Sequence, residues 1–139
     1  MEFKFRLGND VVVGRWDRVD ETGGEVVLVD YKTGEIADQD KAEVRALKSL
    51  KDEQLGLYAL AYVETRQAMP VRVQLHFVDS GLIGEAKVEE KHLEAARERV
   101  REAAAGIRAA SFPPDPDQRK CGYCPYSRFC VHSAARGTG

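Results

Sequence analysis

The sequence predicts an α+β domain, and three observations lead to this prediction. Short runs rich in β-branched and aromatic residues open the chain and recur near residue 75, with turn residues between them. Two segments carry apolar residues at helical spacing, one between these groups of strand-like runs and one after them. The last part is irregular, rich in proline and contains all three cysteines. Strands and helices mixed in this way within one short chain are typical of an α+β domain with a cysteine-bearing C-terminal tail.

Three strands are expected in the first 32 residues. They are EFKFRL (2–7), VVVGRWD (11–17) and VVLVDYK (26–32), joined by turns at GND and ETGGE. Two tight connections in succession predict an antiparallel meander, because parallel strands need long crossovers. The third run is apolar on both faces, which predicts the central strand of the sheet. Residues 34–51 are charged without a clear period, and we expect a loop followed by a short helix there.

The second half predicts a helix, two strands and a long helix. Residues 52–66 form the first helix, because Leu55, Tyr58, Ala59 and Tyr62 share one helical face. VRVQLHFVD (71–79) and the segment around EAKVEE (85–90) are expected as strands. Residues 91–110 are rich in the good helix formers Ala, Glu and Arg, and FPPDPD ends that helix.

Length and composition exclude several classes of protein. A chain of 139 residues holds one well-packed domain, and its 43% of hydrophobic residues is too high for a disordered chain. A net charge of -2 argues against a non-specific nucleic-acid coat protein but not against an enzyme that acts on nucleic acid. No run approaches the roughly 20 apolar residues of a membrane helix, and the first residues lack a signal-peptide pattern. We therefore expect a cytoplasmic protein with no membrane partner.

Acidic residues gather around the predicted central strand. Asp30 and Lys32 lie two apart on that strand and project from one face, while Asp17 ends the preceding strand and Asp20 approaches the turn. Asp30 occupies a position suited to a buried apolar residue, so its charge needs a compensating cation. That cation could be Lys32, in a simple strand-end ion pair, or a divalent metal ion shared with Asp17. Paired carboxylates with a nearby lysine suit metal-assisted phosphodiester hydrolysis, since Mg²⁺ prefers oxygen ligands and activates water.

Four motifs in order resemble the RecB-like branch of the PD-(D/E)XK nucleases. They are GRWDRVD, VLVDYKTG, QLGLYALAY and CGYCPYSRFC, and the resemblance covers the chain from about Gly14 to Cys130. That branch includes nuclease domains of the bacterial RecB and AddB recombination proteins and related CRISPR-associated exonucleases. The resemblance implies a restriction-endonuclease-like core with a central mixed sheet flanked by helices.

The resemblance also implies roles for particular residues. Asp17 and Asp30 match the family's metal ligands for Mg²⁺ or Mn²⁺, with the backbone carbonyl of Tyr31 as a further ligand, and Lys32 matches its catalytic lysine. Gln54 and Tyr58 match the Q-x-x-x-Y helix motif that flanks the active site and contacts DNA. The alternatives are core packing for Tyr58 and a solvated helix start for Gln54.

The tail resembles the iron–sulfur module of the same branch. Cys121, Cys124 and Cys130 follow its Cys-x₂-Cys-x₅-Cys spacing, and a [4Fe-4S] cluster is the implied cofactor. A zinc site or three free thiols is the alternative, and His132 is expected to be an exposed residue rather than a fourth ligand.

Relatives carry a fourth cysteine in a helical segment before the first strand, which is missing here. We therefore expect a fragment of a longer helicase–nuclease, with its core at residues 1–112 and its cysteine tail at 113–139.

These observations lead to one principal hypothesis of function. The chain is expected to be a metal-dependent DNA exonuclease domain that is attached to a helicase and serves recombination and repair. The alternatives are a non-catalytic DNA-binding module with a metal- or cluster-stapled tail, and a zinc-stabilised interaction domain. Among the remaining candidates, His76 is expected to be a strand residue and His92 a helix-surface residue. The basic residues Lys41, Arg45, Lys48 and Lys51 recur at roughly helical spacing and could track phosphates next to the site, but a solvated face is the default expectation.

Overall fold

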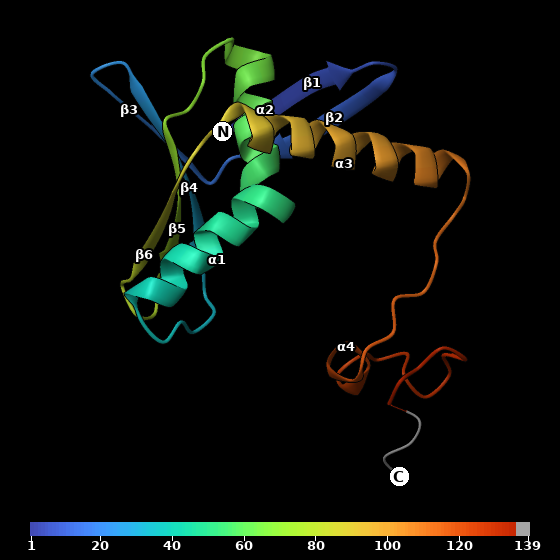
Figure 1. The fold of residues 1–139 in the computed structure, drawn as a ribbon. Helices are drawn as coiled ribbons and strands as arrows, with labels where there is room; N and C mark the ends of the chain where they lie inside the picture. The colour runs from blue at the N-terminus through green and yellow to red at the C-terminus, as the bar shows by residue number, and fades with distance from the viewer. Residues whose placement is uncertain (136–139) are drawn as a thin grey trace. The chain divides into compact units, whose positions relative to one another are not determined.

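The structure, a computed structural model, describes residues 1–135 (Figure 1). Its elements are β1 (Glu2–Leu7), β2 (Asp10–Arg15), β3 (Arg18–Thr22), β4 (Glu25–Lys32), α1 (Gln39–Asp52), α2 (Gln54–Arg66), β5 (Arg72–Phe77), β6 (Ile83–Lys87), α3 (Glu90–Arg108) and α4 (Gln118–Gly122). The chain divides into two compact units, Met1–Ala104 and Ala105–Gly139, and each is described by itself.

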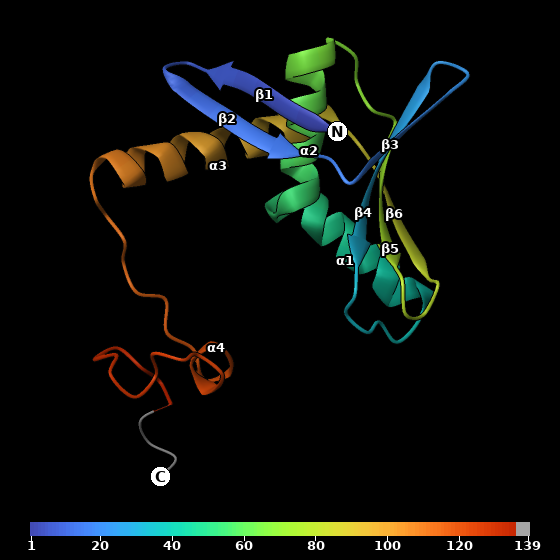
Figure 2. The ribbon, with the colours of Figure 1, turned by 180° about the vertical axis from the view of Figure 1, so that it is seen from behind.

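A mixed four-stranded sheet with the order β3-β4-β5-β6 forms the centre of the first unit. β3 and β6 pair with their neighbours antiparallel, whereas β4 and β5 are parallel. The parallel pair needs a crossover connection, and α1 and α2 supply it. Figures 1 and 2 show both helices on the same side of the strands β4–β6. The predicted α+β class with a mixed sheet flanked by helices is confirmed.

Sequence periodicity explains which face of the sheet the helices cover. Leu28 on β4 and the alternate residues Val73 and Leu75 on β5 are fully buried in one hydrophobic core. α1 approaches β6 so closely that a Cβ added at Gly84 would lie 1.9 Å from the carbonyl oxygen of Ala42. The absence of a side chain at Gly84 therefore permits the helix to lie directly on the strand.

The N-terminal strands differ from the predicted meander. β1 and β2 form a separate two-stranded antiparallel sheet, here called the ribbon, and the neighbour of β4 is a further strand, β3. Gly23 and Gly24 both have positive φ, as the tight turn of the β3–β4 hairpin requires. The expectation that residues 11–17 form one strand is wrong, because the strand ends at Arg15 and the chain crosses from the ribbon to the main sheet at Trp16 and Asp17.

Trp16 explains this change of sheet. Its side chain is 1% exposed, and its ring contacts those of Phe3 and Tyr62 at centroid distances of 4.8 and 5.9 Å. Its backbone N–H donates to the carbonyl of Met1, which closes the open end of the ribbon. Burial of the large indole thus fixes the point at which β2 stops.

The region of residues 34–51 is more regular than expected. Instead of a loop with a short helix, it contains the 14-residue helix α1, whose N-cap Asp38 accepts a hydrogen bond from the backbone N–H of Lys41. The buried residues of α1 include Ala42, Ala46 and Ser49, so its inner face consists largely of small side chains. Together with Leu50 these residues recur at helical spacing, so the sequence does carry the amphipathic pattern of a longer helix.

The second unit contains the end of α3, the short helix α4 and the cysteines. Asp117 caps α4 by accepting a hydrogen bond from the backbone N–H of Lys120, at 2.7 Å. Between residues 105 and 135 no side chain is buried, and Cys121, Cys124 and Cys130 are free thiols of intermediate exposure. No helix in the described part of the chain is both long enough and apolar enough to span a membrane.

Candidate active site

The site begins with two residues at the C-terminal end of β4. Asp30 is 2% exposed, and it continues the inward alternation of Val26 and Leu28. Lys32 lies on the same face two residues later, where Lys32 Nζ is 2.5 Å from Asp30 Oδ2. The expected ion pair is therefore present, with its carboxylate buried and its ammonium partly exposed.

Asp17 joins these residues from the connection between β2 and β3. Its Oδ2 accepts a hydrogen bond of 3.1 Å from the backbone N–H of Tyr31, which holds the Asp17 carboxylate against β4. The sequence predicted this approach from a strand end, but the structure achieves it from the chain crossing after Trp16. Asp20 takes no part, because it forms a two-fold hydrogen-bonded ion pair with Arg18.

Burial and charge set the protonation of Asp30. Burial is the main cause that raises the pKa of Asp30 above its usual value, Lys32 acts in the opposite direction, and the negative charge of Asp17 raises the pKa further. Two carboxylates thus share a small space with a single ammonium group. This arrangement would gain stability from an additional cation.

Gln54 and Tyr58 reach the same place from the first turns of α2. Gln54 Oε1 accepts a hydrogen bond of 2.9 Å from Lys32 Nζ, and Gln54 Nε2 donates one of 3.0 Å to the Tyr58 hydroxyl. Tyr58 is 5% exposed, and its burial, followed by the charges of Asp17 and Asp30, raises its pKa to about 12. Its ring also packs edge-on against Phe3, so Tyr58 belongs to the core and to the site at once. The structure therefore brings Gln54 and Tyr58 together with Asp17, Asp30 and Lys32.

Trp16 is a member of the site that sequence reasoning missed. Its indole Nε1–H donates a buried hydrogen bond of 3.1 Å to the backbone carbonyl of Tyr58. Because Trp16 also immediately precedes Asp17, one side chain fixes the relation between α2 and the Asp17 carboxylate. The sequence did contain a signal for this role, because Trp16 is the only tryptophan of the chain and lies directly beside the candidate metal ligand Asp17.

The donor set suits a hard divalent ion. Asp17 and Asp30 provide two carboxylates, and Mg²⁺ is commonly held by one or two carboxylates completed by water and substrate phosphate. Within residues 1–135, no group of three or more His, Cys, Asp and Glu side chains is placed to hold a metal ion. The role of the Tyr31 carbonyl as a third protein ligand stays a prediction.

The cysteines present no comparable site. Within residues 1–135 their thiols do not form a group that could hold a metal. The backbone N–H of Cys124 donates to the carbonyl of Cys121 at 3.4 Å, but this contact involves the backbone and not the thiols. His132 is exposed, as expected. Cluster binding to this tail therefore stays a prediction.

The other candidate residues have structural partners. His76 is a strand residue as expected, bonded to Gln74 Oε1 at 2.8 Å. The prediction that His92 lies on a helix surface is wrong, because this side chain is 4% exposed and its Nδ1 accepts a hydrogen bond from the backbone N–H of Glu89. Arg45 pairs with Glu53 at 2.6 Å, so α1 offers fewer free cations than its sequence indicates.

Known proteins resemble this chain along nearly its full length. The family model of the PD-(D/E)XK nuclease superfamily matches residues 1–131. The gene 69 protein of Mycobacterium phage L5 is 29% identical over 136 residues, which cover 94% of this chain and 43% of the phage protein. The gene 69 protein of Mycobacterium phage D29 is 30% identical over 135 residues, which cover 92% and 45%. The chain thus spans less than half the length of these relatives.

A solved structure also aligns with the chain. The crystal structure of SSO0001 superposes with a TM-score of 0.47 at 14% identity, covering 96% of this chain and 58% of the other. The match to the family model includes all the site residues and the three cysteines.

Proposed function

Because this chain belongs to the PD-(D/E)XK nuclease superfamily, we propose that it is a Mg²⁺- or Mn²⁺-dependent deoxyribonuclease domain of the RecB-like branch. The observation that carries the proposal is the position of Lys32 Nζ, which contacts Asp30 Oδ2 and Gln54 Oε1 beside the Asp17 carboxylate. The reaction is hydrolysis of a phosphodiester bond in DNA.

Each site residue has a task in this reaction. Asp17 and Asp30 would hold the divalent ion, which supplies activation of water and stabilisation of negative charge. Lys32 places a positive charge where a phosphate oxygen gains charge during attack, and Gln54 fixes the direction of that ammonium group. With a pKa near 12, the Tyr58 hydroxyl stays protonated at neutral pH and can serve as a hydrogen-bonding group.

The finer assignment concerns the whole protein. We assign the domain to an exonuclease that works with a helicase in recombination and repair, inside the cell and on DNA. The four sequence motifs and their order support this assignment, as does the presence of both carboxylates and the lysine in one site. Their joint presence also favours catalysis over a DNA-binding module that has lost its activity.

The decisive experiment compares the wild-type chain with the variant Lys32→Ala. Cleavage of end-labelled linear DNA is measured with Mg²⁺ or Mn²⁺, and a circular substrate separates exonuclease from endonuclease activity. Loss of one preorganised charge typically costs about 10² to 10³ in rate, so the variant should be nearly inactive. Lys87→Ala, which removes an exposed lysine of β6, is the matched control and should cleave normally. Wild-type activity in Lys32→Ala would refute the assignment of the site.

A further inference from the structure

The ribbon has an inner and an outer face of opposite character. Phe3 and Phe5 point inward and are buried, whereas their neighbours Lys4 and Arg6 are exposed. Lys4 stands opposite Val13, and Arg6 stands opposite Val11. The outer face therefore consists of the exposed side chains Glu2, Lys4, Arg6, Val11, Val13 and Arg15.

Two of the three cations of this outer face, Lys4 and Arg6, lie opposite valines, whereas Arg15 lies opposite Glu2. Within residues 1–135 no ion pair or side-chain hydrogen bond involves Lys4, Arg6 or Arg15, and Glu2 is the single acid on their face. Exposed arginines of the main sheet are paired instead, for example Arg18 with Asp20. In a chain with a net charge of -2, this face holds a local excess of positive charge.

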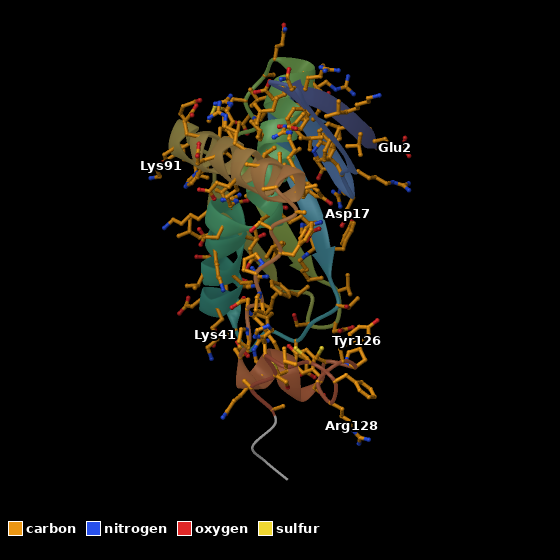
Figure 3. All side chains as sticks on the ribbon, turned by 90° about the vertical axis from the view of Figure 1, so that its right-hand side faces the viewer. Glu2, Asp17, Lys41, Lys91, Tyr126 and Arg128 are labelled. Atoms are coloured by element: carbon orange, nitrogen blue, oxygen red, sulfur yellow. The ribbon has the colours of Figure 1, made fainter. Side chains whose placement is uncertain are left out.

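The cationic face begins at the active site. Arg15 is two residues from Asp17, and backbone hydrogen bonds between Met1 and Trp16 close the ribbon at this end. Figure 3 shows Glu2 and Asp17 on the same side of the structure, with Lys91 on the opposite side. Successive cross-strand pairs on one face lie about 7 Å apart, so Arg15, Lys4 and Arg6 form a row about 14 Å long that leads away from Asp17.

The ribbon is also held firmly. Phe3 packs on Trp16, and the ring lies so close beneath the ribbon that a Cβ added at Gly14 would lie 2.4 Å from Phe3 Cζ. Because Trp16 is bonded to Tyr58 of the active site, the ribbon and the site share one rigid support.

We propose that the outer face of the ribbon binds the phosphate backbone of the DNA strand whose end lies at Asp17 and Asp30. This inference rests on the proposed nuclease function. One strand of duplex DNA carries a charge about every 3.4 Å along the axis, so a row of 14 Å faces roughly four phosphates, enough for each of the three cations. Phosphate contacts of this kind position a protein on DNA, and the exposed valines of the face suit contact with sugars.

The test measures DNA binding apart from cleavage. Fluorescence anisotropy of labelled 20-nucleotide single-stranded and duplex DNA is recorded in EDTA at several salt concentrations. The triple variant Lys4→Gln, Arg6→Gln, Arg15→Gln should bind about tenfold or more weakly at low salt, and the slope of log K against log [salt] should fall by about 2 to 3. The control variant Lys87→Gln, Lys91→Gln, Arg101→Gln removes the same charge from β6 and α3 and should change both quantities little.

Folding and function are controlled separately. All six side chains are exposed, so both variants should keep the thermal transition of the wild type. Equal losses in the ribbon and control variants, or no loss in either, would overturn the ribbon proposal. Cleavage assays with Mg²⁺ run in parallel: binding that depends on the ribbon without any cleavage would support the ribbon and reject the nuclease. Cleavage together with binding that does not depend on the ribbon would support the nuclease and reject the ribbon proposal. A wild-type chain that binds neither the single-stranded nor the duplex DNA would also reject the ribbon proposal.

Discussion

Asp30 concentrates the electrostatic cost of the site in one side chain. Burial of an ionised carboxylate is unfavourable unless hydrogen bonds or opposite charges compensate it. Lys32 provides one compensating charge, whereas the Asp17 carboxylate adds repulsion, and the pKa of Asp30 remains above its usual value. The folded, metal-free protein therefore holds this carboxylate at an energetic disadvantage that a divalent ion would relieve.

The variant Asp30→Asn tests this balance. In EDTA its melting temperature should equal or exceed that of the wild type at neutral pH, because the raised pKa shows that the folded state disfavours the charge. Mg²⁺, Mn²⁺ or Ca²⁺ should stabilise the wild type, by about 2.7 kcal/mol at a concentration of 100 Kd, and the variant should lose most of this gain. The measurement is a thermal melt with increasing metal concentration.

Asp20→Asn serves as the matched control for the same experiment. This carboxylate is on the neighbouring strand but pairs with Arg18 outside the site, so its removal should leave the metal response unchanged. Equal metal-induced shifts in the wild type and in Asp30→Asn would place the ions elsewhere on the molecule.

At the scale of elements, the start of α3 depends on a buried histidine. The backbone N–H of Glu89 donates to His92 Nδ1 at 3.1 Å, an interaction that a Glu or Gln side chain makes in a capping box. Burial lowers the pKa of His92, as does the charge of Lys91 and, more weakly, that of Lys51, against the opposing effect of Glu89. A protonated Nδ1 could not accept the hydrogen bond, so the cap requires a neutral ring.

This cap predicts a dependence of stability on pH. The pKa of His92 is lower in the folded state, so the unfolded chain takes up the proton first as the pH falls. The stabilisation is complete above the unfolded value of about 6.5 and is lost as the pH falls from there through the folded pKa. The Gln side chain of His92→Gln can keep the cap, which is worth about 1 kcal/mol. The free energy of unfolding, measured with urea at pH 7.5 and at pH 5.5, should therefore differ less between the two pH values in this variant than in the wild type.

His76→Gln is the control for the cap prediction. Burial lowers the pKa of His76 as well, so this variant measures how much of the pH dependence another histidine contributes. An unchanged pH dependence in His92→Gln would show that His92 is not the group that titrates.

At the scale of the whole molecule, hydrophobic stabilisation lies in one of the two units. The core cluster and the residues packed against it extend from Phe3 to Val100. In the second unit the large apolar side chains are 66–82% exposed: Ile107, Phe112, Tyr123, Tyr126, Phe129 and Val131. A segment without a core needs a disulfide, a metal or a partner to become rigid.

The tail prediction concerns an iron–sulfur cluster. A [4Fe-4S] cluster normally takes four cysteine ligands, whereas this chain has three, and their thiols are not placed as a ligand group within residues 1–135. The chain purified without oxygen should therefore contain well below one cluster, and that cluster should be lost readily to a chelator. Iron and sulfide analysis and the visible absorption spectrum check this outcome.

The variant Cys124→Ser completes the cluster experiment. It should remove whatever cluster iron the wild type retains, without changing the melting of the first unit, because the core contains no residue beyond Val100. A stable, stoichiometric four-iron cluster in the wild type would contradict the prediction and point to His132, solvent or a second chain as a further ligand.

Local patterns in the sequence determined the α+β class and the pairing of Asp30 with Lys32. Alternation of side chains along a strand is a property of the backbone, so two residues two apart share a face wherever the strand lies. The same holds for Gln54 and Tyr58, whose i, i+4 spacing places them on one helix face before any packing is known. These inferences needed no knowledge of distant segments.

The tertiary structure alone decided how distant segments meet. Trp16 ends β2 because its indole fills a core made by Phe3 and Tyr62, residues that no local pattern connects to it. Gln54 reaches Lys32 because the crossover through α1 returns α2 to the end of β4. The identity of strand partners and the burial of a side chain such as His92 depend on packing between remote elements, and the periodicity of one segment does not encode that packing.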